Sequence, residues 1–168
     1  MTFDSRLLLF PVALASAVAP AQAETFRNPK VGVPAFNVEL LPGWSANYDD
    51  SDNLLLINGD KQVAMTFSVV DNDPKNPFTS VDLAQALFQV LGSPPYDRTE
   101  TGMVDGQRAD IYIGSFTRDD GLELELRVVV IKLGPKYAVA SIITPTGADG
   151  SYVKQGHDQL AKARIIRK

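Results

Sequence analysis

Two neighbouring apolar runs constrain the fold of this chain more than any other feature. Residues 128–131 (VVVI) and 137–143 (YAVASII) are apolar at almost every position, and Gly134-Pro135 lies between them. Successive side chains of a strand point to opposite faces, so a strand that is apolar throughout needs cover on both faces. The short turn favours antiparallel pairing of the two strands. We therefore expect a central strand pair inside a sheet with a layer on each side.

Alternating apolar and polar residues predict further strands on both sides of this pair. Asn58-Gly59 and Asp105-Gly106 are dipeptides typical of two-residue hairpins, which again favours antiparallel neighbours. The full set of expected strands is 36–40, 44–48, 54–57, 62–70, 98–104, 107–116, 122–133 and 137–143.

Two segments have helical rather than strand periodicity. In residues 79–91 the apolar side chains recur at helical spacing, with Thr79 or Ser80 as the N-cap and Gly92 as the stop. Residues 151–163 are a weaker second helix because they contain Gly156. The expected fold is α+β, an α/β/α sandwich around a twisted, mainly antiparallel sheet of about seven strands with two main helices.

The first 23 residues have the pattern of a secretory signal. Arg6 precedes a charge-free run, and Ala21-Gln22-Ala23 matches the small-x-small cleavage pattern, which predicts cleavage after Ala23. The apolar stretch 7–19 is shorter than the ~20 residues that cross a bilayer, so a retained anchor is the weaker alternative. We expect a signal peptide at 1–23, an N-terminal arm at 24–35 and a single domain at 36–168. The product would be periplasmic or secreted, without a membrane span after signal removal.

Charge and cysteine content exclude several classes of function. The 16 Lys and Arg residues against 20 Asp and Glu residues give a net charge of -4, and a nucleic-acid surface would need clustered cations instead. Without cysteine the chain has no thiol nucleophile, no thiolate metal site and no disulfide. We therefore expect no nucleic-acid partner and identify no cofactor.

The single histidine, His157, is the centre of the catalytic alternatives. A serine triad would need this side chain as its base, but no Gly-x-Ser-x-Gly motif accompanies the candidate serines. A zinc site would require two or three further ligands, nearly all of them carboxylates. We favour a surface histidine. The serines considered are Ser68, Ser93, Ser115 and Ser141.

Acidic clusters offer two candidate sites for a divalent cation. Asp71, Asp73 and Asp82 have the spacing of calcium-loop positions one, three and twelve, but Lys75 stands where a ligand belongs. The Asp/Asn/Ser-rich residues 49–53 could hold a weakly bound ion, although such clusters are first of all turn formers. Turns are the favoured interpretation, and no metal ligand is assigned.

Glu123 and Glu125 share one strand face at a separation of about 7 Å, which two glycosidase carboxylates could use. The neighbouring Arg127 favours an ordinary solvated face instead.

Aromatic side chains could line a ligand cleft, but most are expected to be core or boundary residues; they are Trp44, Tyr48, Tyr96, Tyr112, Tyr137 and Tyr152. The basic end, Lys162, Arg164, Arg167 and Lys168, is expected to be a solvated tail whose Ile165 and Ile166 pack back on the sheet.

The order of elements resembles the PsbP-like and DcrB-like superfamily. The resemblance rests on residues 36–44, which end in Pro42-Gly43-Trp44, on strand 63–70 and helix 80–91, and on the later hairpins. That group includes extrinsic photosystem subunits, Ran-binding Mog proteins and small exported bacterial proteins. The resemblance implies an α/β/α sandwich and a mostly non-enzymatic, partner-binding role. It supplies no catalytic residue, and Trp44 is expected to pack structurally.

The favoured hypothesis is an exported, non-enzymatic binding or accessory protein that acts through a protein-protein surface or shallow cleft. Its partner is expected to be a protein of the cell envelope, and a small-molecule ligand is left open. Two alternatives remain: an immunity or inhibitor protein against a secreted enzyme, and a small metal-independent hydrolase that uses acidic residues with His157.

Overall fold

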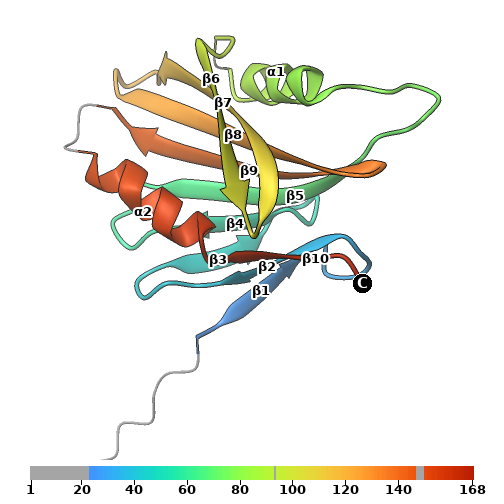
Figure 1. Cartoon of the computed structure of the whole chain (residues 1–168). Coiled ribbons are helices and arrows are strands. Elements are labelled where there is room, and N and C mark those ends of the chain that lie inside the picture. The colour runs from blue at the N-terminus through green and yellow to red at the C-terminus, as the bar shows by residue number, and fades with distance from the viewer. Residues whose placement is uncertain (1–22, 93, 147–149) are drawn as a thin grey trace, which may run out of the picture.

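A seven-stranded antiparallel sheet forms the middle layer of the computed structural model, which describes residues 23–92, 94–146 and 150–168 (Figure 1). Its strands are β3 (Ser45–Tyr48), β4 (Leu54–Ile57), β5 (Ala64–Asp71), β6 (Arg98–Val104), β7 (Gln107–Thr117), β8 (Glu123–Leu133) and β9 (Lys136–Pro145). They lie in the order β3-β4-β5-β9-β8-β7-β6, so the two doubly apolar strands, β8 and β9, pair inside the sheet as predicted.

A second, three-stranded sheet has the order β1-β2-β10 and consists of β1 (Thr25–Asn28), β2 (Ala35–Glu39) and β10 (Ala163–Ile166). Two of its strands differ from expectation. Residues 25–28 were expected in an arm but pair with β2. Ile165 and Ile166 lie in a strand rather than a tail, and Ile165 packs against the main core as expected. Both strands have only four residues, which is too few to show a clear hydrophobic period. Their positions are set by backbone pairing with β2, which has one of them on each side.

The two helices lie on opposite faces of the large sheet. Helix α1 (Ser80–Val90) packs Ala84 and Phe88 against one face. Helix α2 (Ser151–Leu160) and the small sheet cover the other face, where Phe36 and Val38 of β2 join the main core (Figure 1). The α+β prediction is confirmed, and one outer layer of the sandwich is a helix together with a small sheet. Within the described ranges neither helix is long and apolar enough to cross a bilayer.

Helix α1 begins with the expected cap. The Thr79 hydroxyl accepts a hydrogen bond from the Asp82 amide at 3.2 Å, and the Asp82 carboxylate accepts one from the Thr79 amide at 2.8 Å. These reciprocal bonds satisfy two amide groups that the first helical turn leaves without partners. The helix stops before Gly92, whose φ of +67° suits glycine.

One of the two predicted two-residue turns is confirmed. The other is wrong in its loop length, although the strands that it joins, β4 and β5, pair antiparallel as expected. Asp105-Gly106 is a two-residue turn with φ of 49° and 72°, as a type I′ turn requires. Asn58-Gly59 instead begins the six-residue connection 58–63 between β4 and β5. The Asn58 side-chain oxygen accepts bonds from the amides of Gln62 and Val63 at 2.9 and 2.8 Å, which stabilises the longer loop.

Close packing against the large sheet explains why a glycine, Gly156, stands inside α2. A Cβ atom at this buried position would lie 2.7 Å from Cγ2 of Ile142 in β9. The missing side chain therefore lets the helix backbone approach the sheet closely, and this approach offsets the low helix propensity of glycine.

We expect Gly156→Ala to lower the free energy of unfolding by about 1–2 kcal/mol, because the overpacking cost exceeds the ~1 kcal/mol gain in helix propensity. Urea denaturation measures this change. The control Lys154→Ala on the exposed side of α2 removes only a surface ion pair with Asp158 and should stay within about 0.5 kcal/mol. A Gly156→Ala protein as stable as the wild type would contradict the close packing.

Candidate functional site

Strand β6 is an exposed edge of the large sheet. It is the last strand in the order and has seven residues, whereas the other edge strands of the described sheets, β1, β3 and β10, have four each. Thr99, Thr101 and Met103 are exposed, and Met103 is 67% accessible. Short strands and charged side chains usually protect edges, but this row of three residues carries no charge.

The hairpin turn determines which backbone groups of β6 point outward. Residues that flank a two-residue hairpin turn form a hydrogen-bonded pair, and such pairs alternate along an antiparallel ladder. Val104 pairs with Gln107 beside the turn, so Gly102 and Glu100 also direct their amides and carbonyls to β7. Thr99, Thr101 and Met103 direct theirs away from the sheet. Within the described chain no hydrogen bond reaches these three outward positions.

A mostly apolar hollow, the His157 pocket, lies on the α2 side of β6. Its volume is about 360 Å³, within the range of small-ligand sites. β6 and β7 form one wall and α2 the other, and the lining includes Gly102, Met103, Val104, Ile111, His157 and Leu160.

Two polar side chains fix the walls of this pocket through hydrogen bonds. Gln159 of α2 is fully buried, donates to the Glu39 carbonyl at 2.9 Å and accepts from the Leu41 amide at 3.0 Å. These bonds hold α2 against the end of β2. The Asp105 carboxylate at the β6–β7 turn accepts a bond from the Ile165 amide at 2.8 Å, which ties the end of β6 to β10.

A second hollow, the tyrosine pocket, lies on the α1 side of the same strand. It has a volume of about 550 Å³, and its lining includes Ser80, Tyr96, Thr99, Thr101, Asp110 and Tyr112. The Ser80 hydroxyl donates to Asp110 at 3.1 Å and lies 2.8 Å from the Tyr112 hydroxyl. Because the serine proton is used, Tyr112 is the donor in the second bond. The rings of Tyr96 and Tyr112 meet edge to face at 4.9 Å between centroids.

Burial raises the pKa of Tyr112, and the nearby negative charge of Asp110 raises it further. The phenol is therefore neutral at ordinary pH and remains a hydrogen-bond donor. No cation among the described residues forms an ion pair with Asp110. The tyrosine pocket thus combines aromatic rings, hydroxyl groups and a carboxylate without a cationic partner.

Arg98, Glu100, Glu125 and Arg127 form an arginine–glutamate cluster beside the His157 pocket. Glu125 bridges the two arginines at 3.1 Å to Arg98 and 2.7 Å to Arg127. Glu100 completes the ring at 3.6 Å from Arg98 and 3.8 Å from Arg127. The cluster is electrically balanced, and Glu125 and Arg127 are mostly buried. The prediction that Arg127 marks an ordinary solvated face is therefore wrong, because it is a partner in this network.

His157 lies at the exposed end of the His157 pocket, as a surface histidine should. Partial burial lowers its pKa, and the positive charge of Arg127 lowers it further. Its neighbour Asp158 pairs with Lys154, and Glu125 is held by arginines. Within the described chain no side-chain hydrogen bond reaches the imidazole, and Ser68, Ser115 and Ser141 do not line the pocket. Ser93 lies outside the described residues.

The acidic clusters are turn and cap residues. The Asp49 carboxylate accepts a bond from the side-chain amide of Asn53 and further bonds from the backbone amides of Asn53 and Ser51, and these bonds lower its pKa. Asp73 accepts from the Lys75 amide, and Asp82 caps α1. Across the described ranges no group of three or more His, Cys, Asp or Glu residues is arranged to hold a metal ion.

The other aromatic candidates stabilise the fold. Trp44 and Tyr152 pack against the main core, the Tyr48 hydroxyl donates to the Arg27 carbonyl at 2.8 Å, and the Tyr137 hydroxyl donates to the Phe78 carbonyl. Of the six aromatic candidates, Tyr96 and Tyr112 are the two that share a pocket.

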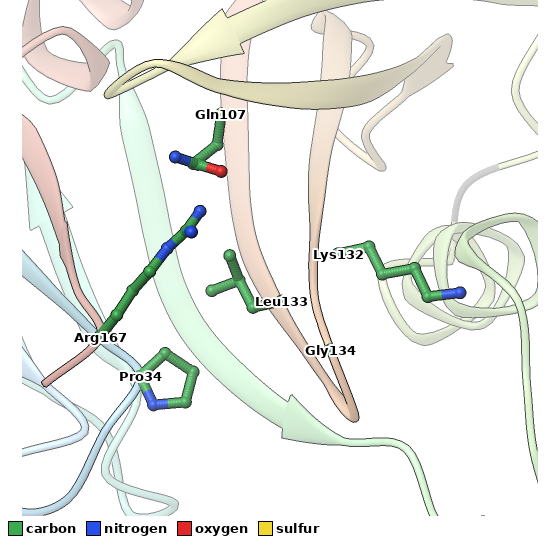
Figure 2. A pocket seen from close by; sticks show the side chains of 6 residues that line it. All are labelled: Pro34, Gln107, Lys132, Leu133, Gly134 and Arg167. Atoms are coloured by element: carbon green, nitrogen blue, oxygen red, sulfur yellow. The ribbon is translucent and has the colours of Figure 1, made fainter.

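A third hollow, the Arg167 pocket, has a volume of about 280 Å³ and lies beside the turn between β8 and β9. The side chains of Gln107 and Arg167 point toward each other across it, and Leu133 points toward Arg167 from the side, whereas Lys132 points away (Figure 2). One exposed guanidinium and one amide are the polar side chains that reach it. This pocket offers no acid–base pair.

No protein-family model and no curated protein matches the chain in sequence. Its structure is similar to the solution structure of cyanobacterial PsbP (CyanoP) from Synechocystis sp. PCC 6803, with a TM-score of 0.61 at 10% identity over 94% of this chain and 100% of that one. LpqN of Mycobacterium tuberculosis, described as involved in cell envelope biogenesis, matches with a TM-score of 0.52 at 12% identity over 86% and 92%.

The Saccharomyces cerevisiae Ran-binding protein Mog1p matches with a TM-score of 0.50 at 10% identity over 86% of this chain and 97% of that one. A Bacteroides thetaiotaomicron protein matches at 0.54 and 12% identity over 79% of this chain, which spans 46% of that longer protein. The chain therefore has the PsbP/Mog1 fold, as the resemblance of its sequence implied.

The sequence did not identify the edge of the sheet as a site. It predicted strand 98–104 but could not show that no neighbour pairs with its outer side. One signal was present: residues 98–103 (RTETGM) have little of the apolar alternation that a covered strand needs. Asp110 and Ser80 are distant in sequence and meet only because α1 crosses the large sheet.

We expect the pKa of His157 to lie below the ordinary 6.5, because the folded protein favours the neutral imidazole. Unfolded chains then bind the proton more readily, so the contribution of His157 to stability falls as the pH drops from 6.5 to the folded pKa and stays level below it. A proton NMR titration measures this directly, since the chain has one histidine.

Arg127→Gln should raise the pKa of His157 by removing the positive charge, whereas Arg118→Gln, in the remote pair with Asp120, should leave it unchanged. Equal midpoints for wild type and Arg127→Gln would contradict this placement of the cluster beside the imidazole.

Proposed function

We propose that this chain is an exported, non-enzymatic accessory protein that binds a protein of the cell envelope through the face formed by β6, the His157 pocket and the tyrosine pocket. The observation that carries the proposal is the seven-residue exposed edge strand with a hollow on each side. Such a face offers contact area and hydrogen-bonding groups rather than a positioned catalytic pair.

The ionic state of the site supports binding over hydrolysis. An acid or base catalyst needs a carboxylate or imidazole that is free to exchange a proton with its substrate. Glu125 is held between two arginines, and Glu100 contacts the same pair. His157 faces mainly apolar side chains rather than a hydroxyl nucleophile. Asp105, the carboxylate that lines the same pocket, accepts a bond from the Ile165 amide and pairs with Arg164 at 3.6 Å. The hydrolase alternative therefore receives no support from the arrangement of these groups.

Two further observations support the location and the kind of partner. Residues 1–23 have the pattern of a secretory signal, with cleavage expected after Ala23. Proteins of the same fold include one described as Ran-binding and one described as involved in cell envelope biogenesis. The inhibitor alternative shares this mode of action and differs only in that its partner is a secreted enzyme.

Photo-crosslinking in the native cells tests the proposal. A benzophenone amino acid is placed at the exposed Met103, and the exported fraction is separated and analysed by mass spectrometry. We expect the protein in that fraction to begin at Glu24 and to form a discrete adduct with one envelope protein. The matched control places the same group at Gln89 on the exposed side of α1, where no adduct is expected.

Three results would contradict the proposal: retention of the protein in the cytoplasm, equal adducts at both positions, or a turnover that His157→Ala abolishes. An adduct with a secreted enzyme that loses its activity would select the inhibitor alternative.

A further inference from the structure

We propose that β6 binds its partner by strand addition: an extended segment of the partner, with alternating cationic and apolar side chains, extends the large sheet beyond β6. This inference rests on the proposed function and names the mode of binding and the chemistry of the bound segment. The occupant is a partner protein, not a second copy of this chain.

The backbone of β6 is ready for such an addition. Thr99, Thr101 and Met103 turn their amides and carbonyls outward, and no described residue bonds to them. An added strand would satisfy these groups through main-chain hydrogen bonds, which supply the affinity in this kind of recognition. The strand lacks proline and outward-directed lysine, two features that prevent edges from pairing.

The two hollows give the added strand its pattern of side chains. Directly opposed residues of neighbouring strands place their side chains on the same face of a sheet. A partner residue opposite Thr101 would therefore extend over the tyrosine pocket, and one opposite Gly102 over the His157 pocket. Successive residues of the partner thus enter different hollows, so its sequence must alternate in character.

The tyrosine pocket suits a lysine or arginine side chain. The Asp110 carboxylate has no cationic partner among the described residues, so it offers an ionic contact. The nearby rings of Tyr96 and Tyr112 provide aromatic surface that favours a cation. The charge of the whole chain, -4, acts in the same direction.

The His157 pocket suits an apolar side chain. Val104, Ile111 and Leu160 line it, and the exposed Met103 lies at its edge. Covering these groups would remove apolar surface from water. Asp105 also lines this pocket, but its charge is paired with Arg164. Together with the neutral imidazole and the balanced arginine–glutamate cluster, this pairing leaves the side without a net charge to attract a partner ion.

Pairing with a second copy fits the site less well. In an antiparallel pair of β6 strands centred on Thr101, each Thr99 would face Met103 of the other copy. Neither side chain is cationic, so Asp110 would again lack a partner. Glu100 would face Gly102, which adds a carboxylate beside the His157 pocket rather than an apolar group.

Synthetic peptides test the inference with the purified protein. The probe is an acetylated and amidated heptapeptide of alternating valine and lysine, titrated while amide chemical shifts are followed by NMR. We expect shifts at Thr99, Thr101 and Met103 and binding that a non-alternating peptide of the same composition does not reproduce. Two further peptides are N-methylated at alternate amides, one at the N–H groups that face β6 and the other at those that face away. The first peptide should not bind, and the second should still bind.

Variants of the protein provide matched controls. Thr101→Pro removes an outward amide that the sheet does not use, so the fold should persist while peptide binding weakens about tenfold. Thr101→Val keeps that amide and should bind like the wild type. Asp110→Asn should weaken the lysine peptide about fivefold, as an ionic contact is lost, and leave a glutamine analogue unchanged.

Several results would overturn strand addition: equal binding of the two N-methylated peptides, chemical-shift changes confined to α1, or a dimer that Thr101→Pro dissociates. The two proposals fail in distinguishable ways. If the Met103 cross-link persists in Thr101→Pro, the binding face stands and strand addition is wrong. If the native cells give no Met103 adduct while the peptide binds as expected, strand addition stands and the proposed cellular partner is wrong.

Discussion

Burial of β8 and β9 on both faces is the constraint on which the rest of the structure depends. Val128 and Val130 face α1, whereas Val129 and Ile131 face the small sheet and α2. A strand pair of this kind cannot fold without both outer layers, since either uncovered face would expose a row of apolar side chains. The chain has no disulfide to replace this packing. Two residues of α2 hold this second layer against the sheet. Gly156 lets α2 approach Ile142 closely, and Gln159 bonds α2 to the end of β2.

The same central burial leaves the far edge of the large sheet less covered. α1 packs on β8 and α2 packs on β9, so both helices lie nearest the middle of the sheet. β7 and β6 extend beyond them, and the hollows on the two sides of β6 lie where the outer layers end. The arginine–glutamate cluster fills part of this space with paired charges rather than apolar side chains. The proposed binding face is therefore a consequence of how the layers cover the sheet.

The central strands, α1 and the Asp105-Gly106 hairpin could be predicted because each has a local pattern: double-sided apolarity, helical spacing with a cap, or a turn dipeptide. β1 and β10 were missed because four residues carry too little periodicity and both depend on β2, distant from β10 in sequence. His157 was correctly expected at the surface. The site itself could not be predicted, because an open edge is defined by a missing neighbour and because Ser80, Asp110 and Tyr112 meet only in the folded chain.

Residue-specific hydrogen exchange along β6 measures directly whether this edge is open in the folded protein. Amides that bond to β7 should exchange slowly, whereas outward amides should exchange rapidly although they lie in the same strand. An open edge predicts alternation, with protection at Glu100, Gly102 and Val104 and rapid exchange at Thr99, Thr101 and Met103. Uniform protection of all six amides in the monomer would show that the edge is already covered and that β6 has no free outer side.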